Sequence, residues 1–411
     1  MKRGDSTSKI LVLAPIYSPC PHSPAQRFSS FVDALQDEGS EVLVVTCNRC
    51  LRHAKTSPLK DKTLIYNFRI PRFLLSSSFV VLNPIILMLY LFMGLAASMR
   101  RRFDIVFASV PAGETAVIGL LISRLFRSRL MIDIRDMYPP PPDGLAFLRT
   151  PLRLNNLLIR FFWMIYRNSD MLVCVDADIK SRLLSSGISS SATTIIPNGA
   201  DSRIYRPSSR SSRQEIRARY GLSPEKLIFV YAGALAWYYP ILEVAKGLKE
   251  ALPKSKNIEL LIVSHTDYTR EKKLVKELGI EDYIKFMGPL PSTKAAEVTS
   301  ACDVGLVVYR GEEYWKGMYG SKIFSYMACG LPILASGPTE SVIHKLLENH
   351  RIGFFVGSPD PVNFRTGLIR FAQSRDDIGS MGKRARTVVE KSYDRRKLAL
   401  DVASLVEKLQ N

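Results

Sequence analysis

The feature that most restricts the fold of this chain is an alternation of short apolar segments with longer amphipathic ones. Five apolar segments in the first half predict strands: Lys9–Ala14, Glu41–Thr46, Asp104–Ser109, Arg129–Ile134 and Met171–Val175. Between the first two lies a stretch with helical periodicity, in which Phe28, Phe31, Val32 and Leu35 share one face. Strands that alternate with helices are typical of parallel α/β architecture.

The alternation stops at a polar stretch rich in serine and arginine, about Asn198 to Pro224, which is predicted to be a linker. Five more strands follow it: Lys226–Ala232, Ile258–Val263, Tyr283–Met287, Asp303–Tyr309 and Pro332–Ala335. A chain of 411 residues has room for two domains. We therefore predict an α/β protein with two Rossmann-like, doubly wound domains, 1–200 and 201–390, that face each other across a ligand-binding cleft. A C-terminal helix, 391–411, is expected to pack back toward the first domain.

The charge balance points to anionic partners. Lys and Arg number 57 against 38 Asp and Glu, a net charge of +19, which favours nucleic acid, acidic lipid or phosphorylated small molecules. No nucleic-acid-binding module is recognisable, so we expect no nucleic acid partner. No GxGxxG follows the first strand and no GxxxxGK[ST] occurs, which argues against dinucleotide oxidoreduction and P-loop phosphotransfer. Cys47 and Cys50 form a lone CxxC without the further ligands of a zinc site, and neither a metal nor a cofactor is predicted.

A long segment without charge, Phe73 to Met99, is followed by three arginines. Asn83-Pro84 predicts that a helix begins at about Pro84. The segment, 73–102 with its arginines, can be a membrane-docking helix, a buried core helix or a true span. Docking on an anionic membrane surface is favoured, since the α/β pattern continues on both sides and one sheet cannot be split across a bilayer.

The richest motif is the stretch 319–336. Gly320 and Ser321 precede a predicted helix, and Lys322 lies in its first turn. Free N–H groups at a helix start, with a lysine beside them, form an anion site suited to a diphosphate. The alternative is an ordinary capped helix with one exposed lysine.

Several stretches, in the same order, resemble the retaining glycosyltransferases of family four, which have the GT-B fold. The likeness is strongest to the branch that builds bacterial O-antigen, capsule and exopolysaccharide. Asp133–Pro139 is similar to D-x-R-D-x-W-P, Ile196–Asp201 to IPNGVD, and Lys322–Ser336 to K-[LI]-F-E-Y-M-A-x-G-x-P-V-[IL]-A-S. The resemblance implies transfer of a sugar from a nucleotide-sugar donor to a lipid-linked or other glycan acceptor, with retention. It also implies a cytoplasmic protein, peripheral on the inner face of the cell membrane.

The departures from the family concern the donor site. The family's Glu-x7-Glu pair falls on Gly317 and Ser325, and no cation follows Gly233, where the family holds the donor diphosphate. Arg310, Lys316 or Lys322 would then have to neutralise the charge of the diphosphate. The full set predicted to bind the donor is Gly233, His265, Arg310, Lys316, Gly320, Ser321, Lys322 and Ser325.

In the first domain the resemblance places Arg135 and Asp136 beside the transferred sugar. Asp136 is predicted as the base toward the acceptor hydroxyl and Arg135 as a partner for a phosphate; the alternative is a structural ion pair. Arg27 either binds an acceptor phosphate or is solvated. Two rival functions remain open: a GT-B scaffold that binds a partner transferase or a glycan lipid without turnover, and a hydrolase or epimerase on the same fold.

Overall fold

The computed structural model describes residues 7–18, 20, 23–47, 64–68, 84–137, 152–236 and 239–410. The chain divides into two compact units. One comprises Met1–Pro197 with Arg396–Asn411, and the other comprises Asn198–Arg395. Each is described by itself.

The first unit is built on a parallel sheet of seven strands in the order β3-β2-β1-β4-β5-β6-β7. The strands are β1 Lys9–Ala14, β2 Glu41–Cys47, β3 Leu64–Phe68, β4 Ile105–Val110, β5 Arg129–Ile134, β6 Met171–Cys174 and β7 Thr193–Ile195. The five predicted strands are present, and the structure adds β3 and β7. These two lie at the edges of the sheet, where a strand buries less surface and leaves a weaker apolar signal in the sequence.

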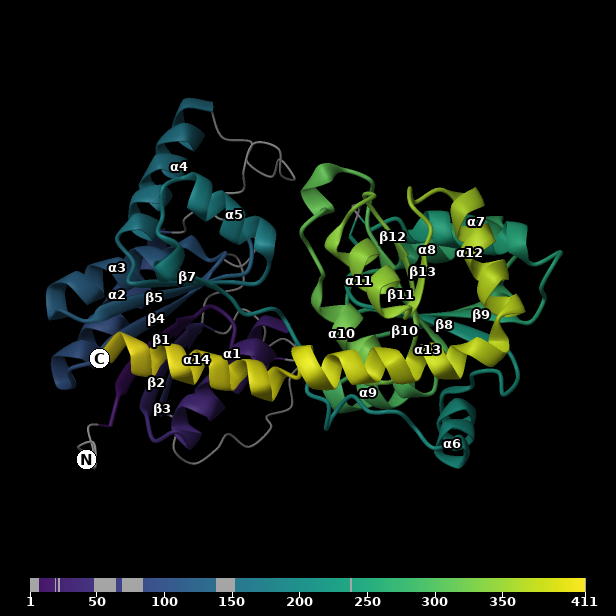
Figure 1. The fold of residues 1–411 in the computed structure, drawn as a ribbon, viewed down its shortest axis with the longest axis horizontal. Helices are drawn as coiled ribbons and strands as arrows, with labels where there is room; N and C mark the ends of the chain where they lie inside the picture. The colour runs from purple at the N-terminus through teal and green to yellow at the C-terminus, as the bar shows by residue number, and fades with distance from the viewer. Residues whose placement is uncertain are drawn as a thin grey trace. The chain divides into compact units, whose positions relative to one another are not determined.

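Helices cover both faces of this sheet (Figure 1). On one face are α1 Ser23–Asp37 and the C-terminal α14 Arg395–Gln410, whose Leu398 and Val402 share a core with β1 and β2. The predicted face of α1 is confirmed, because Phe28, Phe31, Val32 and Leu35 are all buried. The other face is covered by α2 Pro84–Arg100, α3 Gly113–Phe126, α4 Leu152–Arg167 and α5 Ala177–Ser185.

Helix α2 begins at Pro84, as predicted, and belongs partly to the core. The Tyr90 hydroxyl donates to the carbonyl of Ala14 (3.0 Å). A Cβ at Gly94 would come within 2.4 Å of the Ile122 side chain, so glycine is what lets α2 approach α3 this closely. Among the residues that the structure describes, no helix combines the length and the apolar character needed to cross a bilayer. The first part of the predicted docking segment, 73–83, lies outside the described residues.

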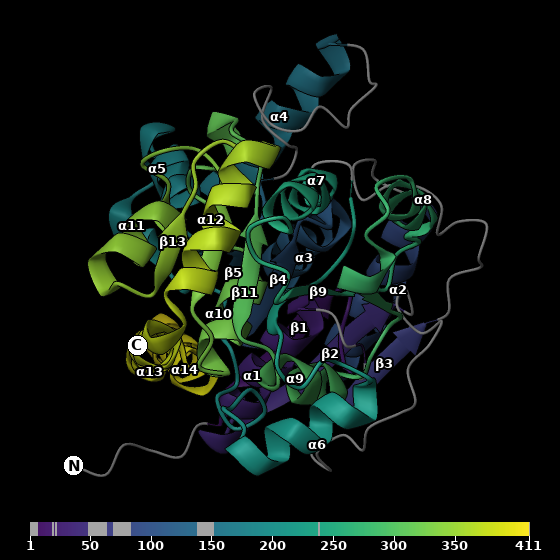
Figure 2. The ribbon, with the colours of Figure 1, turned by 90° about the vertical axis from the view of Figure 1, so that its right-hand side faces the viewer.

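The second unit repeats the architecture with six parallel strands in the order β10-β9-β8-β11-β12-β13. They are β8 Leu227–Ala232, β9 Ile258–Val263, β10 Ile284–Met287, β11 Val304–Val308, β12 Ile333–Ser336 and the short edge strand β13 Gly353–Phe355, which was not predicted. Helices α7 Ile241–Ala251, α8 Thr269–Glu277 and α12 Pro361–Gln373 pack on one face, and α9 Ser292–Ser300 and α10 Ser321–Ala328 lie on the other (Figure 2). The unit also contains α11 Val342–His350 and α13 Arg375–Val388. The prediction of two doubly wound domains is confirmed.

The predicted linker, Asn198 to Pro224, is wrong in its middle, which forms α6 Arg210–Tyr220. Ser209 caps the helix by accepting from the Ser212 N–H, and Gly221 ends it at a positive φ of 63°. Its attachment is polar, because the buried Arg217 guanidinium donates to the Ala301 carbonyl (2.8 Å) and to Asp303 (2.6 Å). Helical periodicity of apolar residues could not reveal a helix that is held by an arginine.

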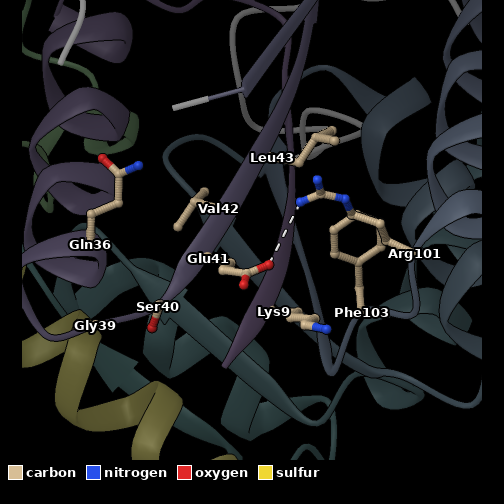
Figure 3. A pocket seen from close by; sticks show the side chains of 9 residues that line it. All are labelled: Lys9, Gln36, Gly39, Ser40, Glu41, Val42, Leu43, Arg101 and Phe103. Carbon is tan, nitrogen blue, oxygen red and sulfur yellow. Dashed lines mark ion pairs between the residues drawn. The ribbon is translucent and has the colours of Figure 1, made fainter. Parts of the chain in front are cut away.

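A pocket of about 370 Å³ opens at the amino edge of the first sheet (Figure 3). Lys9 and Glu41, the first residues of β1 and β2, line it, and Arg101 pairs with Glu41 at 3.6 Å. Ligands of doubly wound sheets bind outside the carboxyl ends of the strands. This pocket therefore lies at the end of the first sheet opposite to the end where a ligand is expected.

Candidate active site

Several of the predicted donor residues follow the carboxyl ends of strands in the second sheet. Gly233 follows β8 directly, His265 follows β9, and Arg310 lies just after β11. Helix α10 begins at the same edge, and no side chain caps its first turn. The N–H groups of that turn therefore remain available to a ligand, and the positive end of the helix dipole favours an anion.

Gly320 is the residue directly before α10, and its backbone conformation determines how the chain enters the helix. Its φ is +65°, and a Cβ on it would fall 2.1 Å from the Tyr309 hydroxyl oxygen. Only glycine therefore fits the turn that leads from β11 into α10. Within the helix, the Tyr326 hydroxyl accepts from the N–H of Ala232 (2.7 Å), so α10 is tied to the end of β8.

Lys322, in the first turn of α10, points to the loop after β8. Its ammonium lies 4.0 Å from the ring centroid of Tyr231 and 4.2 Å from that of Tyr239. A Cβ at Gly233 would lie 3.2 Å from Lys322 Nζ, so the end of the lysine rests against that loop. Desolvation by burial lowers the pKa of Lys322 to about 7.

The other predicted cations are placed less favourably. Lys316 forms an exposed pair with Glu313 (3.2 Å) on the short helix η4 Glu313–Trp315. Arg310 is half-buried beside Tyr309. His265 is exposed, and partial burial lowers its pKa, which keeps the ring neutral near pH 7.

The two positions that depart from the family pattern are both engaged within the unit. Gly317 is buried, and the Ser325 hydroxyl hydrogen-bonds the phenol of Tyr205. Ser325 therefore supports the packing of α10, and a carboxylate for a ribose is missing at this position.

Sequence reasoning missed the aromatic side chains around Lys322. Tyr309 stacks on Trp315 (centroids 4.9 Å apart), and Tyr239 approaches both Tyr231 (6.2 Å) and Tyr309 (5.7 Å). The sequence also places three aromatic residues, Trp237, Tyr238 and Tyr239, in the loop after β8, where they either stack on a base or sugar or simply pack; of these, only Tyr239 is within the described residues. The available signal was that Tyr231 and Tyr309 stand at the carboxyl ends of two neighbouring strands.

In the first unit, Arg135 and Asp136 follow β5. The Arg135 side chain is turned inward: its Nη2 donates to Ser109 Oγ (3.3 Å), and its Nε lies 3.8 Å from the Asp133 carboxylate. Asp136 is exposed at the carboxyl edge. The surrounding protein raises the pKa of Asp136 by desolvation and Arg135 opposes that shift; because the residue is exposed, we expect solvent to keep it ionised near pH 7.

Arg27 is neither solvated nor directed toward a ligand. It is 3% exposed and pairs with the fully buried Asp133 through Nη2 (2.7 Å) and Nε (3.1 Å). Its Nη1 and Nη2 also donate to the carbonyls of Pro197 and Ile196 (2.8 and 2.7 Å). All three nitrogens are therefore used inside the unit. This geometry corrects the expectation that Arg27 binds an acceptor phosphate: it holds β5 and the chain after β7 together.

A further carboxyl at this edge was not predicted. Asp176 caps α5 by accepting from the Ile179 N–H (2.8 Å). Its pKa is raised to about 7, mainly by desolvation; the hydrogen bond from the Ile179 N–H opposes this shift, and the charges of Asp178 and Asp136 add to it. Within the described residues, no group of three or more His, Cys, Asp or Glu side chains is placed to hold a metal ion.

The outer side of α2, α3 and α4 exposes large apolar side chains. They include Met88 (61%), Phe92 (71%) and Met99 (79%) on α2; α3 adds Leu121 and Leu125, and α4 adds Leu157, Phe161 and Met164. We call these eight residues the apolar face. Among the side chains of these helices whose burial is described, four arginines are exposed, Arg100, Arg124, Arg160 and Arg167, and the single acidic residue, Glu114, is buried.

Comparison with known families assigns each unit. Residues 26–203 match the model of Glycosyltransferase Family 4, and residues 212–388 match that of Glycosyl transferases group 1. Sulfoquinovosyl transferase SQD2 of Arabidopsis thaliana is 24% identical over 90% of this chain and 67% of its own length. The probable glycosyltransferase WbjE of Pseudomonas aeruginosa is 23% identical over 74% of each chain.

Solved structures share the architecture over nearly the whole chain. HepE of Anabaena, in complex with UDP and glucose, superimposes with a TM-score of 0.72 at 16% identity and covers 98% of this chain and 100% of its own. Sucrose-phosphate synthase of Thermosynechococcus elongatus gives 0.73 at 18% identity, with 98% and 99% covered. Two doubly wound units and these matches define a glycosyltransferase with the GT-B fold. Within that class, the first unit matches the Glycosyltransferase Family 4 model and the second unit matches the Glycosyl transferases group 1 model.

Proposed function

We propose that this glycosyltransferase moves a sugar from a nucleotide-sugar donor to a lipid-linked glycan acceptor, with retention, during cell-surface polysaccharide assembly. The observation that carries the donor assignment is the uncapped start of α10 with Lys322 beside it, at the carboxyl edge of the second sheet. HepE, which has the same architecture, was solved with UDP.

The catalytic part of the proposal rests on the first unit. Asp136 is exposed at the carboxyl edge and acts as the base toward the acceptor hydroxyl. Arg135 holds the turn after β5 through Asp133 and Ser109, and so positions Asp136. The leaving diphosphate is stabilised by the α10 N–H groups and a cation, so that the acceptor can attack from the face that the leaving group vacates.

We further propose that the apolar face docks on the cytoplasmic side of the cell membrane. Eight exposed apolar side chains on adjacent helices form a surface that water hydrates poorly, and four arginines without an exposed carboxylate on those helices suit anionic lipid. Each arginine near such a surface contributes about 1 kcal/mol. Docking there would bring the acceptor edge of the first unit to a lipid-linked acceptor.

The donor and the reaction are tested with the wild-type protein. Thermal stabilisation is measured with UDP, GDP, dTDP, CMP and their sugar conjugates, and nucleotide release is then measured with and without a polyprenyl-diphosphate-linked sugar. We expect one nucleotide class to stabilise the protein and release to require the acceptor; the anomeric coupling constant of the product reports retention. Asp136→Asn should keep donor stabilisation and lose transfer at least 100-fold, in the range of a lost general base.

Other outcomes decide against the proposal. If no nucleotide stabilises the protein, the donor assignment is wrong. If a nucleotide stabilises the protein but no nucleotide is released under any condition, the non-catalytic scaffold is favoured. Gly317 and the Ser325–Tyr205 contact are the observations that support this alternative. Release that does not need an acceptor would favour a hydrolase.

Docking is tested by flotation with vesicles of phosphatidylcholine alone or mixed with phosphatidylglycerol. The wild type should bind only the anionic vesicles. The double variant Met88→Ser/Phe92→Ser should bind at least tenfold more weakly, because it removes two of the most exposed apolar side chains. Leu400→Ser is the matched control, since Leu400 is 48% exposed on α14, across the sheet. A wild type that ignores anionic vesicles, or a double variant that binds normally, would refute docking.

A further inference from the structure

The charge of Lys322 is held in an unusual way. In the part of the chain that the structure describes, no carboxylate pairs with its ammonium; its contacts are the ring faces of Tyr231 and Tyr239, 4.0 and 4.2 Å away. A cation over aromatic faces gains about 0.5–2 kcal/mol, less than burial of a charge costs. A lysine kept this way is therefore ready to pair with an anion that enters the site.

The position of this charge is as informative as its environment. The sequence has no cation in the described part of the loop after β8, yet the end of Lys322 lies against Gly233, the first residue of that loop. A Cβ at Gly233 would press on both Nζ (3.2 Å) and Cε (3.3 Å). The absence of a side chain at this position is what lets the lysine of α10 bring its charge to the end of β8.

We propose that Lys322 is the cation that meets the donor diphosphate, and that Tyr231 and Tyr239 are positioning residues that hold it free of any carboxylate until the ligand arrives. This inference rests on the proposed nucleotide-sugar donor. The role of Tyr231 is supported by its burial and by its hydroxyl, which donates to the carbonyl of Ala234 (2.6 Å) and fixes the ring. Tyr239 is fixed by packing against Tyr309 and Trp315.

The arrangement couples binding to a proton. The titratable groups placed against the Lys322 ammonium are phenols: Tyr231 from β8 and Tyr239 from the following loop. Tyr309, just after β11, packs on Tyr239, and Tyr326 lies on the same helix as Lys322. Phenols are neutral near pH 7, so they do not offset its charge. With a pKa of about 7, Lys322 is partly deprotonated in the empty site. A diphosphate restores the proton, and affinity should fall about tenfold per pH unit above that pKa.

The first test is calorimetric titration of the full-length protein with UDP, and with inorganic pyrophosphate, from pH 6.5 to 9 in buffers of different ionisation enthalpy. The wild type should take up close to one proton at about pH 8 and should lose affinity as the pH rises. Lys322→Arg should bind without this dependence, because guanidinium stays charged. Lys322→Met should bind weakly at every pH. Tyr239→Phe should behave as the wild type, since it keeps the ring face, whereas Tyr239→Leu should lower the pH at which affinity is lost.

A second measurement separates this inference from the proposed function. In protein labelled with ¹³Cε-lysine, the Lys322 resonance should be shifted upfield by the two rings and should titrate near neutral pH. In Tyr239→Leu it should lose the part of the shift that this ring contributes. An ordinary lysine resonance, or UDP binding that is flat with pH in the wild type, would overturn the role of Lys322. A shifted, titrating Lys322 in a protein that binds neither UDP nor pyrophosphate would overturn the donor assignment, and this role with it.

Discussion

Replacing Arg27 with methionine removes the cation that neutralises Asp133 in the interior of the first unit. Arg27 is 3% exposed and Asp133 is 0% exposed. A buried charge left without its partner costs about 3–5 kcal/mol, and the carbonyls of Ile196 and Pro197 also lose their donors, at about 1–3 kcal/mol. Arg135, 3.8 Å from Asp133, offsets part of this cost. We therefore expect a loss of about 4 kcal/mol, a large share of the 5–15 kcal/mol of a typical domain.

A loss of this size lowers the Tm of a unit of this length by roughly 8–16 °C. Hydrogen-exchange mass spectrometry reads the two units separately: peptides from β1 and β5 should lose protection, whereas peptides from β8 and β11 should not. Arg129→Met is the control, because Arg129 forms an ion pair of nearly the same length with Asp170 (2.8 Å) but is 62% exposed; its loss should cost less than about 1 kcal/mol. If Arg27→Met keeps its protection and instead raises the KM for the acceptor, Arg27 is an acceptor ligand and our reasoning is wrong.

Two further predictions concern the edges of the sheets. Gly320→Ala should abolish stabilisation by the nucleotide. It should also lower the free energy of unfolding, measured by thermal unfolding, by about 1–3 kcal/mol more than Gly279→Ala does. Both glycines have a φ near +65°, but only at Gly320 would the new Cβ meet a neighbour, Tyr309. Equal losses of stability in the two variants would show that backbone strain, and not the contact with Tyr309, causes the loss. Because the pKa of Asp176 is raised to about 7, the folded state binds more protons than the unfolded state between about pH 4 and 7, and stability should fall as the pH rises through that window. In Asp176→Asn, which retains an N-cap, the decline in Tm between pH 5 and 8 should be smaller, and an unchanged decline would exclude Asp176 as its cause.

How much of the site could be predicted from the sequence depended on whether its signal was local. The glycine before α10 and the lysine in its first turn stand in one short motif, and their place at the carboxyl edge follows from the α/β alternation. Tyr231, which is far from Lys322 in the sequence, carries no signal that it would support that ammonium. The contact arises because β8 and β11 are neighbours in the sheet, and α10, which follows β11, brings the lysine back over the end of β8.

Elements whose residues are buried in a regular period can be predicted from the sequence alone. These include the interior strands of both sheets, the buried face of α1 and the start of α2 at Pro84, because burial on one face imposes a pattern on consecutive residues. The role of Arg27 follows only from the fold, because it depends on Asp133 and on carbonyls after β7. The same is true of α6, which is held by Arg217. These side chains act through partners that are distant in the chain, and no period in the sequence encodes such a pairing. Topology alone brings them within reach.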